Sequence, residues 1–105
     1  MKKYYYNGFL IRQSKNEYAY AVCSVNALKN VLHVYSCNKN IELAEKSLSK
    51  ERENAYSAME RWARVINSPN ETKERKQTAT EYYNRIKMFI ETMQIIKLEV
   101  VDKQK

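Results

Sequence analysis

Hydrophobic and polar positions alternate along the first third of the chain and recur at a helical spacing along the rest. Residues 3–13, 17–25 and 31–37 are rich in tyrosine, phenylalanine, isoleucine and valine, which favour β-strands. Two short segments, residues 14–16 and 26–30, separate them and are typical of turns. The pattern predicts a three-stranded antiparallel sheet over about residues 3–37.

The two faces of this predicted sheet differ in the size of their side chains. One face carries Ala19, Ala21 and Cys23, whose small side chains would let a helix lie close to the strands, so we assign it to the core. The opposite face is then expected to be exposed. It carries four tyrosines and an arginine: Tyr4, Tyr6, Arg12, Tyr18 and Tyr20.

Apolar residues at a spacing of three or four predict a first helix over about residues 40–67, with Asn38 or Asn40 available as its N-cap. A second helix is predicted over about residues 69–96. Its start is indicated by Ser68-Pro69-Asn70-Glu71, which offers a cap, a proline in the first turn and a glutamate three residues after the cap. Residues 95–101 fit the end of this helix and a short terminal strand equally well, and both interpretations stay open.

Two helices of similar length joined by a tight turn predict an antiparallel hairpin. Pairing the helices from that turn places Met59 near Ala79, and Ala55 near Tyr82 or Tyr83. Part of the first helix would then face residues 70–78, which contain no apolar residue, and would need another partner. That part carries Trp62, Val65 and Ile66. The chain is thus predicted to be one α+β domain over residues 1–105, a three-stranded antiparallel sheet followed by a long two-helix hairpin.

Size and composition narrow the class of protein. The chain has 105 residues and a mass of 12.5 kDa, and its apolar runs are only a few residues long, so we expect neither a membrane span nor an export signal. Nineteen Lys and Arg against twelve Asp and Glu give a formal charge of +7. This charge attracts phosphate backbones and acidic protein surfaces alike. We therefore expect a cytoplasmic binding protein whose partner the charge alone does not identify.

The residues with the chemistry of metal ligands are Cys23, His33 and Cys37. In the predicted sheet Cys23 lies opposite His33, with Cβ atoms roughly 5 Å apart, and Cys37 lies about 13 Å farther along its strand. One interpretation is a zinc site formed by all three; the other is a reduced core thiol beside a hydrogen-bonded histidine. No other cofactor is expected.

Catalysis has little support in the sequence. A cysteine nucleophile with His33 as its base would lack a nucleophile turn, an orienting residue and an oxyanion donor. We expect no enzymatic activity.

Aromatic and basic residues indicate where a partner would bind. Nine tyrosines are present, and tyrosine suits both base stacking and protein interfaces. On the hairpin, Trp62 lies beside Arg61 and Arg64. The predicted partner-binding residues are Tyr4, Tyr6, Arg12, Tyr18, Tyr20, Arg61, Trp62, Val65 and Ile66.

Three segments carry a resemblance: residues 3–12 (KYYYNGFLIR), residues 18–22 (YAYAV) and residues 42–46 (ELAEK). They resemble small accessory proteins of Gram-positive prophages and mobile elements, including some anti-CRISPR proteins. The resemblance covers about the first half of the chain. It implies an inhibitor, acting in the cytoplasm of a bacterial host, that binds a type II CRISPR effector nuclease and blocks DNA loading or cleavage.

Two other functions stay open at this point. The chain could be a nucleic-acid-binding accessory protein that uses the tyrosine-rich sheet face. It could also be a homodimer that pairs through Trp62, Val65 and Ile66.

Overall fold

The computed structural model describes residues 1–102 and is of the α+β class, as predicted. Within this range it contains six strands and two helices. Their bounds are β1 (Lys2–Tyr6), β2 (Phe9–Ser14), β3 (Tyr20–Val25), β4 (Val31–Asn38), α1 (Ile41–Asn67), α2 (Lys73–Thr92), β5 (Met93–Lys97) and β6 (Glu99–Asp102).

The strands form two antiparallel three-stranded sheets, in the orders β2-β1-β6 and β4-β3-β5, and the single predicted sheet is therefore wrong. The predicted first strand is in fact a hairpin. It reverses at Asn7-Gly8, where Tyr6 pairs with Phe9 and the two turn residues have φ of 49° and 81°. Asparagine and glycine tolerate these positive values, and a two-residue turn of this kind matches the twist of the flanking strands. The chain after α2 joins the sheets, because β5 pairs with β3 and β6 pairs with β1.

Strand β3 lies in the middle of the molecule and is buried on both faces. On one face Ala21, Cys23 and Val25 pack in a cluster with Tyr4 of β1. On the other face the Ser24 hydroxyl donates a hydrogen bond to the Phe89 carbonyl of α2, over 2.9 Å. The helices therefore cover the Ser24 face, and the face of small residues packs against the other sheet, contrary to the prediction.

The first helix begins and ends as predicted. The Asn40 side chain caps it by accepting a hydrogen bond from the Leu43 amide, and its last residue is Asn67. Ile41–Asn67 packs antiparallel to α2, which confirms the hairpin.

The second helix differs from the prediction at both ends. Ser68 caps the end of α1 and forms a turn with Glu71, and Thr72 is the N-cap that accepts a hydrogen bond from the Arg75 amide. Helix α2 thus begins at Lys73, four residues later than predicted. It ends at Thr92, and residues 93–102 form β5 and β6 instead of continuing the helix.

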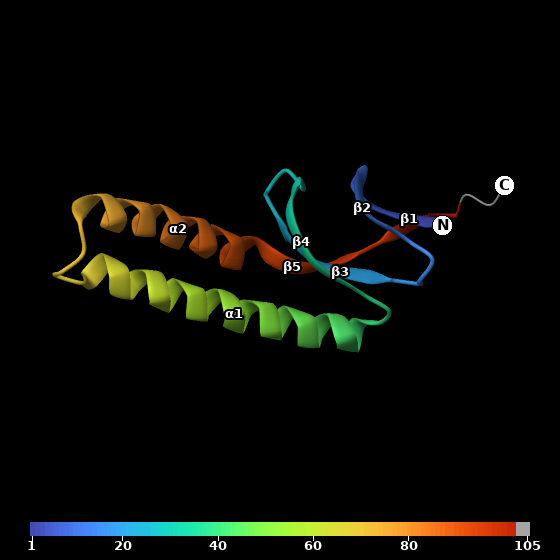
Figure 1. Cartoon of the computed structure of the whole chain (residues 1–105). Helices are drawn as coiled ribbons and strands as arrows, with labels where there is room; N and C mark the ends of the chain where they lie inside the picture. The colour runs from blue at the N-terminus through green and yellow to red at the C-terminus, as the bar shows by residue number, and fades with distance from the viewer. Residues whose placement is uncertain (103–105) are drawn as a thin grey trace.

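The molecule is elongated, with principal extents of 61 × 24 × 23 Å. Figure 1 shows why: α1 starts beneath the β4-β3-β5 sheet and runs out past it, and α2 returns alongside it. The helical hairpin contacts that sheet only near its base, where the Arg52 guanidinium lies 3.4 Å from the Met93 carbonyl and Ser47 bonds to Ser36. The end of the hairpin with the 68–72 loop projects beyond both sheets. Neither helix is apolar enough over a sufficient length to cross a membrane, as judged over residues 1–102.

Candidate partner-binding surfaces

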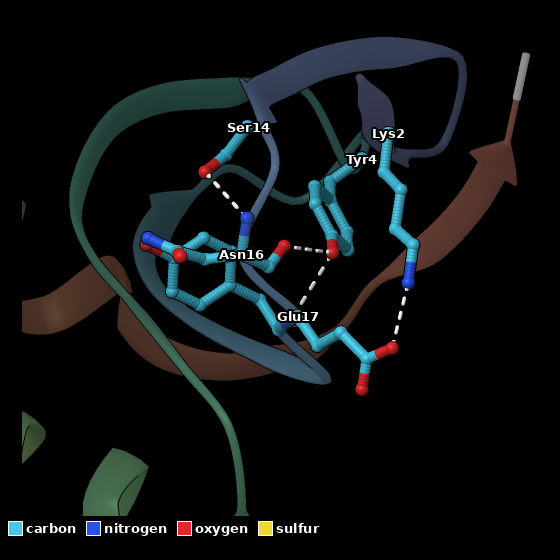
Figure 2. Close-up of polar contacts among 6 residues, drawn as sticks. Lys2, Tyr4, Ser14, Asn16 and Glu17 are labelled. Carbon is cyan, nitrogen blue, oxygen red and sulfur yellow. Dashed lines mark hydrogen bonds and ion pairs between the residues drawn. The ribbon is translucent and has the colours of Figure 1, made fainter.

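Tyr4 was expected on an exposed face but is 1% exposed. Figure 2 shows its hydroxyl between two backbone groups of the segment that follows β2. The hydroxyl donates to the Asn16 carbonyl over 2.6 Å and accepts from the Tyr18 amide over 3.1 Å. The buried Tyr4 side chain, whose hydroxyl both donates and accepts a hydrogen bond, therefore anchors this segment and is not accessible to a partner.

The other residues of the predicted tyrosine face do not form one open surface with Tyr4. Tyr6, Tyr18 and Tyr20 are half-buried. Arg12 is exposed, and its guanidinium carbon lies 5.6 Å from the centre of the Tyr18 ring. Sequence reasoning missed this because it treated the tyrosines as one face of one sheet, whereas Tyr4 and Tyr20 belong to different sheets.

The hairpin holds the clearest cluster of interface-type side chains. The Trp62 indole on α1 stacks on the Tyr82 ring on α2, with centroids 4.9 Å apart and planes 19° from parallel. Arg85, one turn after Tyr82, places its guanidinium carbon 5.7 Å from the centre of the same ring. The predicted register, with Ala55 near Tyr82 or Tyr83, is therefore wrong.

Helical spacing extends this cluster into a surface. Val65 lies three residues after Trp62, on the same side of α1, and is half-buried. Arg61 and Arg85 are exposed, and Tyr82 is 42% exposed. We call these five residues, Arg61, Trp62, Val65, Tyr82 and Arg85, the Trp62 face. Ile66, the remaining predicted hairpin residue, is half-buried on the same helix.

The described part of the chain leaves the Trp62 face largely uncovered. Of all residues in the two helices only Ala44 and Ala79 are fully buried. Two helices packed only on each other cannot enclose side chains as large as Trp62 and Tyr82. This part of the hairpin therefore has the exposed apolar character of a surface that receives a partner.

Sequence reasoning missed Tyr82 and Arg85 because it started α2 at the Ser68-Pro69 signal. In the structure the N-cap is Thr72, which starts α2 about one turn later and brings Tyr82 opposite Trp62. Thr72 is a residue type that favours helix N-caps, but the Ser68-Pro69 pattern predicts an earlier start of this helix.

The structure does not bring Cys23, His33 and Cys37 together as metal ligands. Cys23 pairs in register with Val34, because an irregularity in β4 shifts the pairing, and His33 pairs with Ser24. The two cysteines pack in the cluster between the sheets, whereas the His33 ring contacts Tyr35 and Phe89 on the helix side. No group of three His, Cys, Asp or Glu in residues 1–102 is placed to hold a metal ion.

The cysteines behave as core thiols. Burial, with a smaller contribution from neighbouring Cys37, raises the pKa of Cys23 to about 12. Burial also raises the pKa of Cys37, which is half-buried. Both thiols are therefore protonated, weak nucleophiles at neutral pH.

Comparison of the chain with protein-family models, with curated proteins and with solved structures gives no match.

Proposed function

We propose that this chain is a non-enzymatic binding protein whose partner protein docks on the Trp62 face. The observation that carries the proposal is the stack of Trp62, Tyr82 and Arg85 on the two helices, which project beyond the sheets (Figure 1). Tryptophan, tyrosine and arginine are the residue types that dominate the binding energy of protein interfaces. Stacking holds their side chains in place before binding, which lowers the entropy lost on association.

The charge of the Trp62 face favours an acidic partner. Arg61 and Arg85 are exposed, and none of the five residues is a carboxylate. Arginine binds carboxylates through paired hydrogen bonds and stacks on aromatic rings at the same time. The partner surface that would complement the Trp62 face is acidic and has an apolar depression that receives Trp62.

A binding role also agrees with the chemistry of the cysteines and the histidine. The Cys23 thiol, with its pKa raised to about 12, is a poor nucleophile, and His33 lies on the other face of the sheet from it. This separation supports a protein that acts by occupying a surface.

For the partner itself we propose a bacterial defence protein, a type II CRISPR effector nuclease, which the chain inhibits by blocking DNA loading or cleavage. The support is the resemblance of residues 3–12, 18–22 and 42–46 to small accessory proteins of prophages, including anti-CRISPR proteins. A projecting hairpin suits this role, because it can reach into a groove that DNA would otherwise enter.

The test is a DNA-cleavage assay with a purified type II effector and its guide RNA. The wild-type chain should reduce cleavage when it is added before target DNA, and Arg85→Glu should relieve that inhibition. Tyr56→Ala is the matched control, because Tyr56 is an exposed aromatic residue on α1 that lies about 120° round the helix from Trp62. Addition after DNA distinguishes a block of loading from a block of cleavage. Full cleavage at a large molar excess of the wild-type chain would refute the proposed partner.

A further inference from the structure

Positive charge is concentrated at the end of the molecule opposite the hairpin loop. Residues 1–40 carry six Lys and Arg against one carboxylate, Glu17, whereas the remaining 65 residues carry thirteen against eleven. In Figure 1 the N-terminus, the link after β2 and the connection from β4 to α1 lie together at that end. Residues 1–40, which form β1 to β4, therefore carry a net charge of +5 out of the +7 of the whole chain.

Three cations meet around the segment that links β2 to β3. Arg12 lies over the Tyr18 ring of this segment, and Lys15 is part of it. The Ala19 amide donates a hydrogen bond to the Asn38 carbonyl over 2.9 Å, which places Lys39 beside the same segment. We call Arg12, Lys15 and Lys39 the basic end.

The basic end keeps its charge available. Glu17, the one carboxylate within residues 1–40, is held by Lys2 at 2.7 Å. Within residues 1–102, Arg12, Lys15 and Lys39 form no ion pair with a carboxylate, and all three are exposed. Glu17 lies close enough to Lys39 for the charge of Lys39 to lower its pKa, but its ion pair is with Lys2, which leaves the three cations of the basic end without a direct carboxylate contact among residues 1–102.

The segment itself is fixed, so the cations have defined positions. Tyr4 bonds to its backbone at Asn16 and Tyr18, and the Tyr4 and Tyr18 rings meet edge to face with centroids 5.5 Å apart. Cations on a segment held by these contacts suit a regular array of negative charges.

We propose that the basic end binds the phosphate backbone of a nucleic acid, independently of its sequence and of the Trp62 face. Lysine and arginine side chains that neutralise phosphates release condensed counterions, and this release drives binding. The three cations predict a slope of log K against log salt of about −2.7 on duplex DNA, which is roughly a fortyfold loss of affinity between about 50 and 200 mM salt.

The test is fluorescence anisotropy with labelled duplexes of two unrelated sequences, measured over a salt series. The combined variant Arg12→Gln, Lys15→Gln, Lys39→Gln should lose at least roughly tenfold in affinity and most of the salt slope. The control variant Lys46→Gln, Lys50→Gln, Lys87→Gln removes the same charge from exposed helix positions and should bind within about twofold of wild type. Trp62→Ala should also bind DNA normally.

Three outcomes would overturn this inference. The first is that the wild-type chain does not bind DNA at low salt. The second is that both triple variants lose the same affinity for DNA. The third is that the wild-type chain binds polyglutamate as tightly as DNA, which would indicate attraction to any polyanion. The charge-retaining variant Arg12→Lys, Lys15→Arg, Lys39→Arg should bind DNA like wild type, and an unchanged circular dichroism spectrum of the glutamine variant shows that its loss of affinity is not a failure to fold.

Discussion

The indole of Trp62 stacks on the ring of Tyr82, twenty positions later in the chain, with ring centroids 4.9 Å apart. This pair joins α1 to α2 within the helical hairpin. It also leaves Trp62 half-buried and Tyr82 42% exposed, so the same contact that orders the hairpin presents its aromatic rings at the surface.

Tyr82→Ala should loosen the end of the hairpin without unfolding the sheets. Loss of the stacked pair removes about 0.5–1.5 kcal/mol beyond the loss of buried area. Trp62 is the one tryptophan of the chain, so its fluorescence reports on this site directly. We expect a red-shifted emission and a lower Tm. Tyr56→Ala should leave the emission unchanged, and an equal shift in that control would show that Tyr82 has no special relation to Trp62.

Tyr4→Phe should destabilise the β-sheet part of the molecule. The change leaves the ring but removes the hydroxyl that bonds to the Asn16 carbonyl and the Tyr18 amide, which leaves two backbone groups without their partner (Figure 2). We expect a loss of about 1–3 kcal/mol in the free energy of unfolding, measured by urea denaturation. Tyr5→Phe on the same strand is the control, because the Tyr5 hydroxyl makes no hydrogen bond with residues 1–102. Equal midpoints for the two variants would contradict this role of Tyr4.

The ion pair between Lys2 and Glu17 predicts a small dependence of stability on pH. The hydrogen bond from Lys2 and its charge, with a further contribution from Lys39, lower the pKa of Glu17 from its ordinary value of 4.5. The folded state therefore binds this proton less tightly than the unfolded state does. The resulting stabilisation is complete above pH 4.5 and is lost as the pH falls through the folded-state pKa.

Thermal unfolding of wild type and Glu17→Gln from pH 7 to pH 3 tests this dependence. The wild-type advantage in Tm should be small, because the pair is exposed, and it should shrink below pH 4.5 and at high salt. An advantage that grows on acidification would contradict the assignment.

The two thiols should differ in reactivity. Cys23 is fully buried with a pKa raised to about 12, whereas Cys37 is half-buried and lies in the electrostatic reach of Arg12, which opposes the rise in its pKa. A thiol reagent at pH 8 should label Cys37 first and Cys23 only under unfolding conditions, as mass spectrometry of peptides would show. Labelling of Cys23 at the rate of an exposed thiol would mean that the core between the sheets is open.

The parts of the fold that local patterns determine could be predicted from the sequence. Helix α1 follows from its apolar spacing and from Asn40 as a cap, and both bounds agree with the structure. Asn7-Gly8 is a strong hairpin signal that was overlooked within a run of strand-forming residues. A turn at Asn7-Gly8 divides the predicted first strand into two paired strands, which can form a sheet separate from that of residues 20–38.

The features that depend on long-range pairing could not be predicted in the same way. Strand β3 carries apolar residues on both faces, which fits a strand between two layers as well as one in a single sheet. Residues 93–102 became strands because β1 and β3 each offered an unpaired edge, a fact that no local period reveals. The Trp62 face depends on the start of α2, which is at Thr72 and not at Pro69, so the three residues on α1 could be predicted and the two on α2 were missed.

The most direct test of the account is calorimetric titration of a purified type II CRISPR effector nuclease with the wild-type chain and with the combined variant Trp62→Ala, Arg85→Ala. The wild-type chain should bind with a one-to-one stoichiometry, and the variant should bind at least roughly thirtyfold more weakly, the effect of losing about 2 kcal/mol at an interface centre. Tyr56→Ala should bind like wild type. Binding that is equal in all three chains would contradict the Trp62 face as the docking surface, and no binding by the wild-type chain would contradict the proposed partner.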